Sequence, residues 1–174
     1  MVSVSLVDPD TEVTAIERLL TAADNSFVPP LSSDARAAIA RSGDEGDATS
    51  IADYLDACLA RPMVAAFDGD TLVGFASFHR CDDHPTLEPY TPTTHVDVLV
   101  VAESHRNCGV ATRLYHSLLE ELPRTLETPF VSTKTWSTNH AHLAILERLA
   151  FTCVGRVPDD RGPGIDTVYY AREG

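Results

Sequence analysis

One segment constrains the fold of this 174-residue chain more than any other. The apolar run Val98–Val101 is followed by a short turn and then by Val110–Leu122, where apolar residues recur with a helical period. The first pattern is typical of a buried strand, and the second of an amphipathic helix that packs on a sheet. We therefore expect a strand that turns abruptly into a helix within an α/β fold.

Strand patterns on both sides of this segment define the fold class. Before it, the turn Asp68-Gly69-Asp70 separates two apolar runs, Met63–Phe67 and Thr71–Arg80, which predicts a hairpin. After it, the patterns predict a strand, a helix capped by Ser137, Thr138 or Asn139, and two closing strands, at Pro129–Trp136, Asn139–Leu149, Phe151–Val157 and Thr167–Arg172. Strand pairs at both ends favour a mixed sheet over a doubly wound one.

The first third of the chain reads as helical and irregular. Apolar periodicity predicts helices at Glu12–Ala23, Ser33–Arg41 and Ser50–Leu59. The length suits one domain that spans residues 1–174.

Charge and composition limit the partners. With 13 basic and 26 acidic residues, the formal net charge is −13, and no basic cluster exists that could neutralise nucleic-acid phosphates. No stretch approaches the ~20 apolar residues of a membrane helix, and no secretory signal is readable. The four scattered cysteines match neither a disulfide framework nor a zinc site, although Cys81 and His84 could form one ligand pair. We expect a soluble cytoplasmic protein that binds neither nucleic acid, nor membranes, nor metal.

The turn after Val101 has the character of an anion site. We expect Arg106–Ala111 to form the first turn of the following helix, where backbone amides lack internal partners and the helix dipole favours negative charge. Small residues at Gly109 and Ala111 would let a pyrophosphate approach the backbone. The alternative is a tight turn that simply needs glycine. The phosphate loop of nucleotide hydrolases and the full dinucleotide motif are absent.

This segment resembles the acetyl-CoA motif of the GNAT superfamily of N-acetyltransferases, Arg/Gln-x-x-Gly-x-Gly/Ala, at Arg106, Gly109 and Ala111. Asn139–Phe151 resembles the second motif of the family, in which an Asn opens a helix that ends in Leu-Gly-Phe. The two motifs stand in the family's order, and the clear match covers residues 95–157. The resemblance implies a GNAT-like fold, which is a mixed, mostly antiparallel sheet flanked by helices and splayed at the strand that holds the cofactor.

The resemblance also implies how acetyl-CoA would bind as the acyl donor. Backbone groups of the strand would hold the pantetheine arm, amides of the turn would hold the pyrophosphate, and the Asn would approach the pantetheine or the thioester. The implied residues are Leu99, Val100, Val101, Arg106, Asn107, Cys108, Gly109, Val110, Ala111, Thr112 and Asn139.

The catalytic groups are less clearly marked. Asp97 lies where the family often places a glutamate base, and His95 shares its strand face by two-residue alternation. Either residue could instead be a polar group at the sheet edge or a salt-bridge partner. Many relatives carry a tyrosine that protonates the leaving thiolate, whereas this chain has Leu146, and Ala150 replaces the usual glycine. The remaining candidates for that proton are Tyr169, Tyr170 and His142.

These features together predict an N-acetyltransferase. It would move an acetyl group from acetyl-CoA to the primary amine of a small acceptor by direct attack in a ternary complex. Acidic loops that would border the acceptor side would favour a cationic acceptor, and the alternative is that they are ordinary solvated loops. Their acidic residues are Asp44, Glu45, Asp82, Asp83, Glu88, Asp159, Asp160 and Asp166. Arg161–Gly164 could instead steer an acceptor that bears a carboxylate. The alternative function is a non-catalytic acyl-CoA-binding sensor, and relatives that dimerise leave a homodimer possible.

Overall fold

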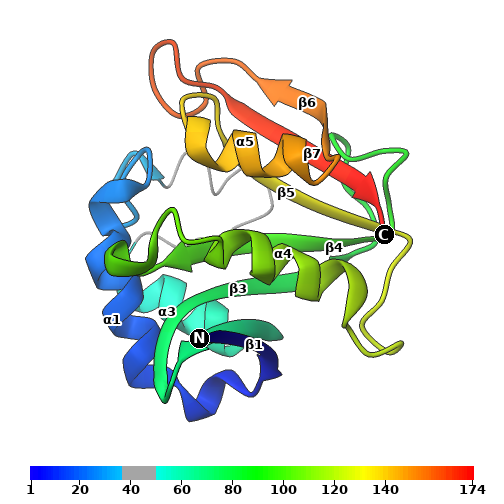
Figure 1. Ribbon diagram of the computed structural model, residues 1–174. Helices are drawn as coiled ribbons and strands as arrows, with labels where there is room; N and C mark the ends of the chain where they lie inside the picture. Colours follow the sequence, from blue (N-terminus) through cyan, green and yellow to red (C-terminus); the bar gives the residue numbers. More distant parts are fainter. Residues whose placement is uncertain (37–49) are drawn as a thin grey trace.

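A seven-stranded sheet in the order β1-β2-β3-β4-β5-β7-β6 forms the centre of the computed structural model, which describes residues 1–36 and 50–174 (Figure 1). Every neighbouring pair of strands is antiparallel except β4 and β5, which are parallel. The prediction of a mixed, mostly antiparallel sheet is therefore confirmed. The strands are β1 (Val2–Val7), β2 (Met63–Asp68), β3 (Thr71–Cys81), β4 (Thr93–Val101), β5 (Phe130–Trp136), β6 (Thr152–Val157) and β7 (Thr167–Glu173).

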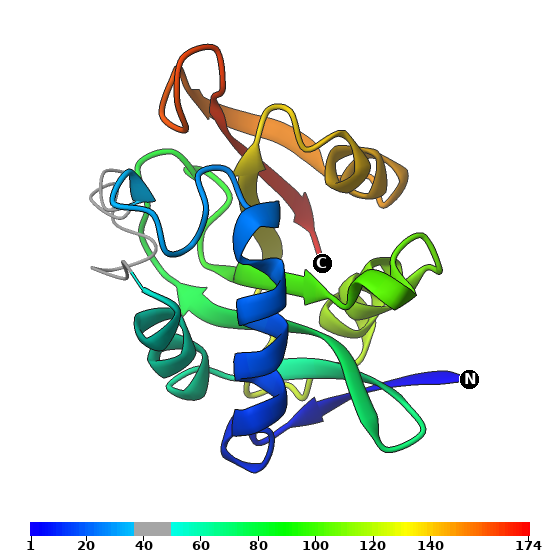
Figure 2. The same cartoon turned by 90° about the vertical axis from the view of Figure 1, so that its left-hand side faces the viewer.

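Helices cover both faces of the sheet (Figures 1 and 2). One face carries α1 (Val13–Ala23) and α3 (Ile51–Leu59), and the other carries α4 (Val110–Glu120) and α5 (His140–Arg148). Each face has its own apolar core, because Phe75 and Val98 pack with α1 and α3 whereas Ala76 and Val96 pack with α4 and α5. Short 3₁₀ turns complete the described elements at η1 (Pro9–Thr11), η2 (Asp24–Ser26) and η3 (Glu103–His105).

Local sequence explains where these helices form. In α1, Ile16, Leu19, Leu20 and Ala23 are buried, which is the apolar stripe that predicted the helix. Helix α3 begins after Ser50, whose side chain accepts a hydrogen bond from the Asp53 amide while the Asp53 carboxylate accepts one from the Ser50 amide. Such a reciprocal cap typically contributes about 1 kcal/mol to helix stability.

The hairpin and a glycine behind it fix the position of α4. As predicted, β2 and β3 are joined at Asp68 and Thr71, with Gly69 at a φ of 60°. A Cβ at Gly74 on β3 would lie 3.0 Å from the Val100 carbonyl oxygen and 3.2 Å from Cγ1 of Val110. The absence of a side chain there lets the first residue of α4 pack directly on the sheet, beside the end of β4.

The first third of the chain contains a strand that the sequence patterns did not predict. The reading of this region as only helical and irregular was wrong, because Val2–Val7 forms β1 and pairs with β2. Alternation of Val2 and Val4 with serines carries that signal, but the strand lies at the sheet edge and is only half-buried. The predicted helix Ser33–Arg41 lies largely outside the described residues. Among the helices that are described, none is long and apolar enough to cross a membrane.

Candidate active site

Strands β4 and β5 diverge at the centre of the sheet. They pair only over four residues each, Thr93–Val96 with Phe130–Thr133. Beyond this point β4 runs on to Val101 and β5 to Trp136 without pairing with each other. Backbone groups along that edge of β4 therefore face a gap instead of a neighbouring strand, and the predicted splay is confirmed.

A β-bulge lies where the strands part. Val96 pairs with Phe78 and Val98 pairs with Ser77, which leaves Asp97 as an extra residue on β4. The bulge reverses the side of the sheet to which the side chains after it point. Val96 packs in the core under α4, whereas Val98 packs in the core under α1. In a regular strand these two residues would share a face. Asp97 is therefore held by the register of the sheet itself.

The carboxylate of Asp97 is buried and ion-paired on one side only. Its Oδ2 accepts hydrogen bonds from Arg61 Nη1 at 2.8 Å and from His79 Nδ1 at 2.7 Å, and its side chain is 2% exposed. Oδ1 is buried without a hydrogen-bond partner among the described residues. Buried carboxylate oxygens are almost always hydrogen-bonded, so this oxygen is suited to accept from a bound ligand. The half-buried His79 links the carboxylate to solvent.

His95 is buried beside this cluster, in contact with His79. Its ring packs edge-on against His79, with 5.7 Å between the centroids, and its Nδ1 lies 2.8 Å from Ser132 Oγ. Thr93 donates to the same Ser132 oxygen, so the serine hydroxyl can donate to the histidine. His95 is 1% exposed and is not among the residues that line the cavity described next. Its proposed role as a base stays a prediction.

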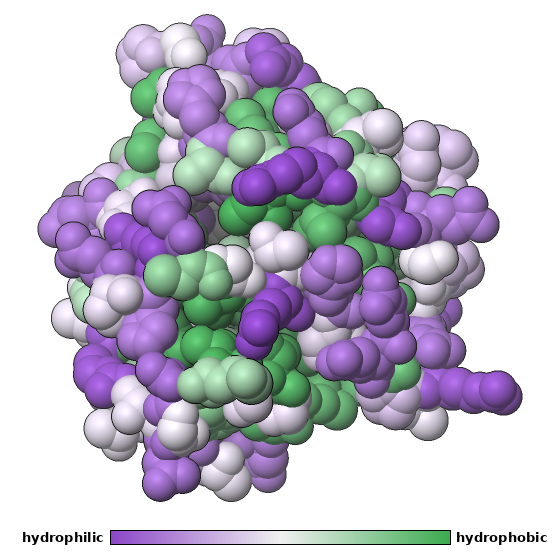
Figure 3. Space-filling model, viewed as in Figure 1, coloured by the Kyte–Doolittle hydropathy of each residue, from purple (hydrophilic) through white to green (hydrophobic). Residues whose placement is uncertain are grey.

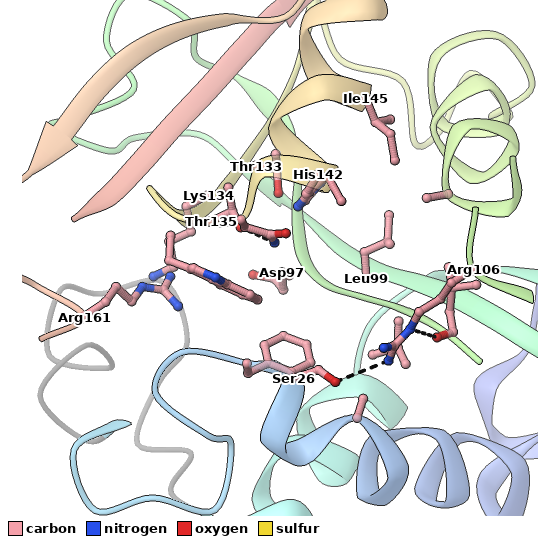
Figure 4. Close-up of a pocket in the computed structure, with 18 of the residues that line it drawn as sticks. Ser26, Asp97, Leu99, Arg106, Thr133, Lys134, Thr135, His142, Ile145 and Arg161 are labelled. Carbon is pink, nitrogen blue, oxygen red and sulfur yellow. Dashed lines mark hydrogen bonds between the residues drawn. The ribbon is translucent and has the colours of Figure 1, made fainter. Parts of the chain in front are cut away.

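A cavity of about 290 Å³ fills the splay and opens toward both faces of the sheet. In Figure 4, Asp97 lies at its middle, with Lys134 and Thr135 on one side and Leu99 on the other. His142 of α5 lies above Asp97 in this view, and Ser26 lies below it. The cavity thus joins the α1 side of the sheet to the α5 side through the gap between β4 and β5.

The turn between β4 and α4 differs from the predicted one in a way that matters. We expected Arg106–Ala111 to be the first helical turn, but α4 begins at Val110. Asn107 and Gly109 have φ values of 60° and 79°, a left-handed conformation that keeps them out of the helix and that glycine adopts without strain. None of the amides of residues 107–112 donates a hydrogen bond to any residue in 1–36 or 50–174. These amides therefore form a concave donor surface at a helix N-terminus, which is an anion site.

A groove of about 560 Å³ leads from this turn to the cavity. One wall contains Gly109 and Thr112, and the other contains Ala144 and Arg148 of α5. The space-filling view shows apolar side chains between α4 and α5, where the groove runs (Figure 3). The groove and the cavity share five lining residues, which are Val101, Arg106, Ala111, Ala141 and Ile145. The two spaces therefore form one channel.

Most residues that the resemblance assigned to the cofactor lie along this channel. Leu99, Val100 and Asn139 line the cavity, while Asn107, Gly109, Val110 and Thr112 line the groove. Cys108 is exposed, directs its thiol to the Arg106 carbonyl and lines neither space.

Two of these side chains make hydrogen bonds that the sequence did not indicate. Asn139 is the N-cap residue of α5, but its side chain makes no capping bond and donates to Thr135 Oγ1 at 3.0 Å. Arg106 donates to the Val101 carbonyl and to Ser26 Oγ, both at 3.3 Å. It therefore bridges the end of β4 and η2.

A tyrosine–histidine pair on the α5 side of the cavity was not singled out from the sequence. Tyr115 of α4 is fully buried, and its hydroxyl oxygen lies 2.7 Å from Nε2 of His142, which lines the cavity. Burial lowers the pKa of His142 to about 4 and raises that of Tyr115 above its ordinary value. Leu146 is fully buried in the core, and Tyr169 and Tyr170 on β7 do not line the cavity. His142 is thus the one of the three remaining candidates that reaches it.

The shifted pKa of His142 gives a test of this environment. Because its pKa of about 4 in the folded protein lies below the ordinary 6.5, the unfolded chain binds more protons between these values. The free energy of unfolding should therefore fall as the pH drops from 6.5 to 4, with this residue contributing on the order of 2 kcal/mol. Urea unfolding of the wild type and of His142→Gln across this range should show a smaller loss in the variant. Equal losses would contradict the assignment.

The acidic loops do not reach the described part of the cavity. Asp82 pairs with Arg80 at 2.7 Å and Asp166 with Arg156 at 2.9 Å, and neither acid lines the cavity. Asp44 and Glu45 lie outside the described residues. Besides Asp97, the charged residues that line the described part of the cavity are all cations, namely the buried Arg36, Lys134 and Arg161 and the exposed Arg106. Over residues 1–36 and 50–174, no group of three or more His, Cys, Asp or Glu side chains is arranged to hold a metal ion.

Solved structures share this fold. An acetyltransferase of the GNAT family from Bacillus cereus has a TM-score of 0.66 and 15% identity, over 99% of this chain and 97% of that one. An N-acetyltransferase from Staphylococcus aureus has a TM-score of 0.67 and 14% identity, over 99% and 98%. The protein yncA from Salmonella typhimurium, solved with its cofactor acetyl-CoA, has a TM-score of 0.66 and 16% identity, over 99% and 93%.

Sequence comparison reaches the same family. A search of curated proteins found no match. The family model described as the Acetyltransferase (GNAT) family, however, matches residues 31–151, which is more than half of the chain and includes the splay, the turn and all of α5. The chain therefore belongs to the GNAT family of acetyltransferases.

Proposed function

We propose that this protein transfers an acetyl group from acetyl-CoA to a primary amine by direct attack, with both substrates bound together. The observation that carries the proposal is a single channel through the splayed sheet. At one end it has amides without partners in the described chain, and at the other a buried carboxylate oxygen without one. An anionic donor and a cationic amine can thus meet in the gap from opposite sides.

The groove suits the donor. The free amides of residues 107–112 would hold the pyrophosphate, with Arg148 on the opposite wall. Pantetheine carries amides, and the unpaired edge of β4 from Leu99 to Val101 offers backbone groups that can bind it as an added strand would. The yncA protein was solved with acetyl-CoA, which supports the same donor here.

The cluster at Asp97 suits the acceptor. A primary amine arrives as an ammonium ion and must lose a proton before it can attack. Oδ1 of Asp97 would accept that proton, while Arg61 holds the carboxylate in position through the other oxygen. His79 donates to the same carboxylate and is half-exposed, so it would pass the proton to water. The bulge keeps these groups in place.

Besides its primary amine, the acceptor could carry further positive charge or a carboxylate. The formal net charge of −13 favours a cationic acceptor, whereas Arg36, Lys134 and Arg161 in the cavity wall favour one that bears a carboxylate. A polyamine and an amino acid of matched length distinguish these two cases. Faster turnover of the polyamine would support the cationic acceptor, and faster turnover of the amino acid would support the other.

Formation of acetylated product tests the activity itself. Purified protein is incubated with acetyl-CoA and a panel of primary amines, and the products are detected by mass spectrometry. We expect product with at least one amine and none when the amine is omitted. Stoichiometric binding of acetyl-CoA without product from any amine would contradict the proposal and favour a non-catalytic acyl-CoA sensor.

A further inference from the structure

The Tyr115–His142 pair has no part in the reaction as described so far, yet it borders the cavity. His142 belongs to the first turn of α5 and lines the cavity with Asp97 and Leu99. Its Nε2 is held by the Tyr115 hydroxyl, while its Nδ1 makes no hydrogen bond to any residue that the structure describes. A histidine fixed at one nitrogen and open at the other is arranged to exchange a proton at the open one.

The hydrogen bond between Tyr115 and His142 allows either group to be the donor. The Val96 carbonyl oxygen can only accept, so the Thr133 hydroxyl donates to it at 3.1 Å, and the Thr133 oxygen remains able to accept. Proton exchange at Nδ1 requires the Tyr115 proton to point toward Thr133, so that His142 donates to Tyr115 through Nε2–H. In that tautomer Nδ1 keeps a lone pair.

Helix geometry relates this histidine to the missing tyrosine. Residues 142 and 146 are one turn apart on α5 and share a face. Helical side chains lean toward the N-terminus, so a long side chain at position 146 would extend over position 142. Leu146 is too short to do so and is fully buried in the core. Of these two residues, His142 lines the cavity and Leu146 does not.

We propose that His142 carries a proton from the attacking amine nitrogen to the departing sulfur. The step rests on the proposed acetyl transfer. The nitrogen–carbon bond forms, the carbon–sulfur bond breaks, and its electron pair stays on sulfur. Nδ1 takes the proton that the nitrogen must lose on becoming an amide and delivers it to the thiolate. The imidazole ends as it began, and the first ammonium proton leaves separately through Asp97 and His79.

The acidities of the groups fit this transfer. The pKa of about 4 means that His142 is neutral near pH 7, so the Nδ1 lone pair is available. An ordinary thiol has a pKa of about 8.5, so an imidazolium at this position gives its proton to a thiolate readily. Tyr115 is a positioning residue in this scheme, because it touches His142 and not the substrate.

Activity measurements give the first test. In His142→Gln, kcat should fall on the order of 100-fold, the scale of proton-transfer catalysis, while the Kd of acetyl-CoA stays within about twofold. His140→Gln, at an exposed neighbour on the same helix, is the matched control and should keep wild-type kcat. The double variant His142→Ala, Leu146→Tyr should have a kcat at least tenfold higher than that of His142→Ala alone. Wild-type kcat in His142→Gln would overturn the proposal.

Nitrogen NMR of the histidine gives a test that needs no turnover. We expect the His142 ring to be protonated at Nε2, and Tyr115→Phe to give a mixture of tautomers. Binding of CoA should shift the Nδ1 resonance, assigned by its loss in His142→Gln, whereas desulfo-CoA should not. No difference between the two ligands would overturn the role of His142 even if the enzyme is active. A wild type that yields no acetylated amine would instead remove the proposed function, whatever the NMR shows about the sulfur contact.

Discussion

Replacing Gly109 with aspartate should raise the Kd of acetyl-CoA at least about 100-fold. The glycine stands in the middle of the free amides at a φ of 79°, and no atom lies within 4 Å of the position a Cβ would take. A side chain therefore fits, but an aspartate would place its carboxylate among the donors that should receive the pyrophosphate. Two like charges about 4 Å apart near a protein surface repel by roughly 4 kcal/mol, which corresponds to a loss of more than 100-fold. Calorimetry measures the change.

Gly109→Asn is the matched control for this variant. Asparagine has the shape of aspartate without its charge, and both residues tolerate the left-handed conformation better than other side chains do. We expect Gly109→Asn to bind acetyl-CoA within about tenfold of the wild type. Equal affinity of Gly109→Asp and the wild type, in folded protein, would remove the groove as the donor site.

The second large effect should appear in Asp97→Asn. Because this residue should take the first proton of the amine, we expect kcat to fall about 100- to 10,000-fold. Asparagine keeps an oxygen for Arg61 and His79, and the donor groove lies on the other side of the splay. The Kd of acetyl-CoA should therefore stay within about twofold. Steady-state kinetics over a range of pH, together with calorimetry, measure both quantities.

Two other variants show whether that loss is specific. Asp83→Asn removes an equally negative but exposed side chain from a loop, so it should keep wild-type kcat. His95→Ala tests the second residue that the sequence suggested as a base. Because His95 does not line the cavity, we expect a smaller loss than in Asp97→Asn. Wild-type activity in both Asp97→Asn and His95→Ala would exclude the pair from catalysis.

The groove and the turn at its end were the parts of the candidate site most readily predicted from the sequence. In the sequence, the residues involved lie next to the elements that they shape, so local patterns and family motifs locate them. They are Val98–Val101, Gly109 and Asn139. The exact start of α4 was predicted wrongly, because the positive φ values of Asn107 and Gly109 delay the helix to Val110.

The side-chain clusters around Asp97 and His142 could not be predicted to the same extent. Asp97 was named, but its partners Arg61 and His79 come from the link between α3 and β2 and from β3, and only the fold of the sheet brings them together. Tyr115 reads as one more apolar residue on the stripe of α4, and nothing local links it to His142, which is 27 residues away. A polar group within an apolar helical stripe was the one available signal.

Titration of acetyl-CoA into the purified protein by calorimetry tests the central claim most directly, with a free adenine nucleotide as the control ligand. The channel through the splay predicts binding at one site, with an affinity that the nucleotide cannot reproduce because it lacks the pantetheine arm and the acetyl group. No heat, together with no displacement of acetyl-CoA by CoA, would contradict the claim, and the turn at Gly109 would then be only a turn.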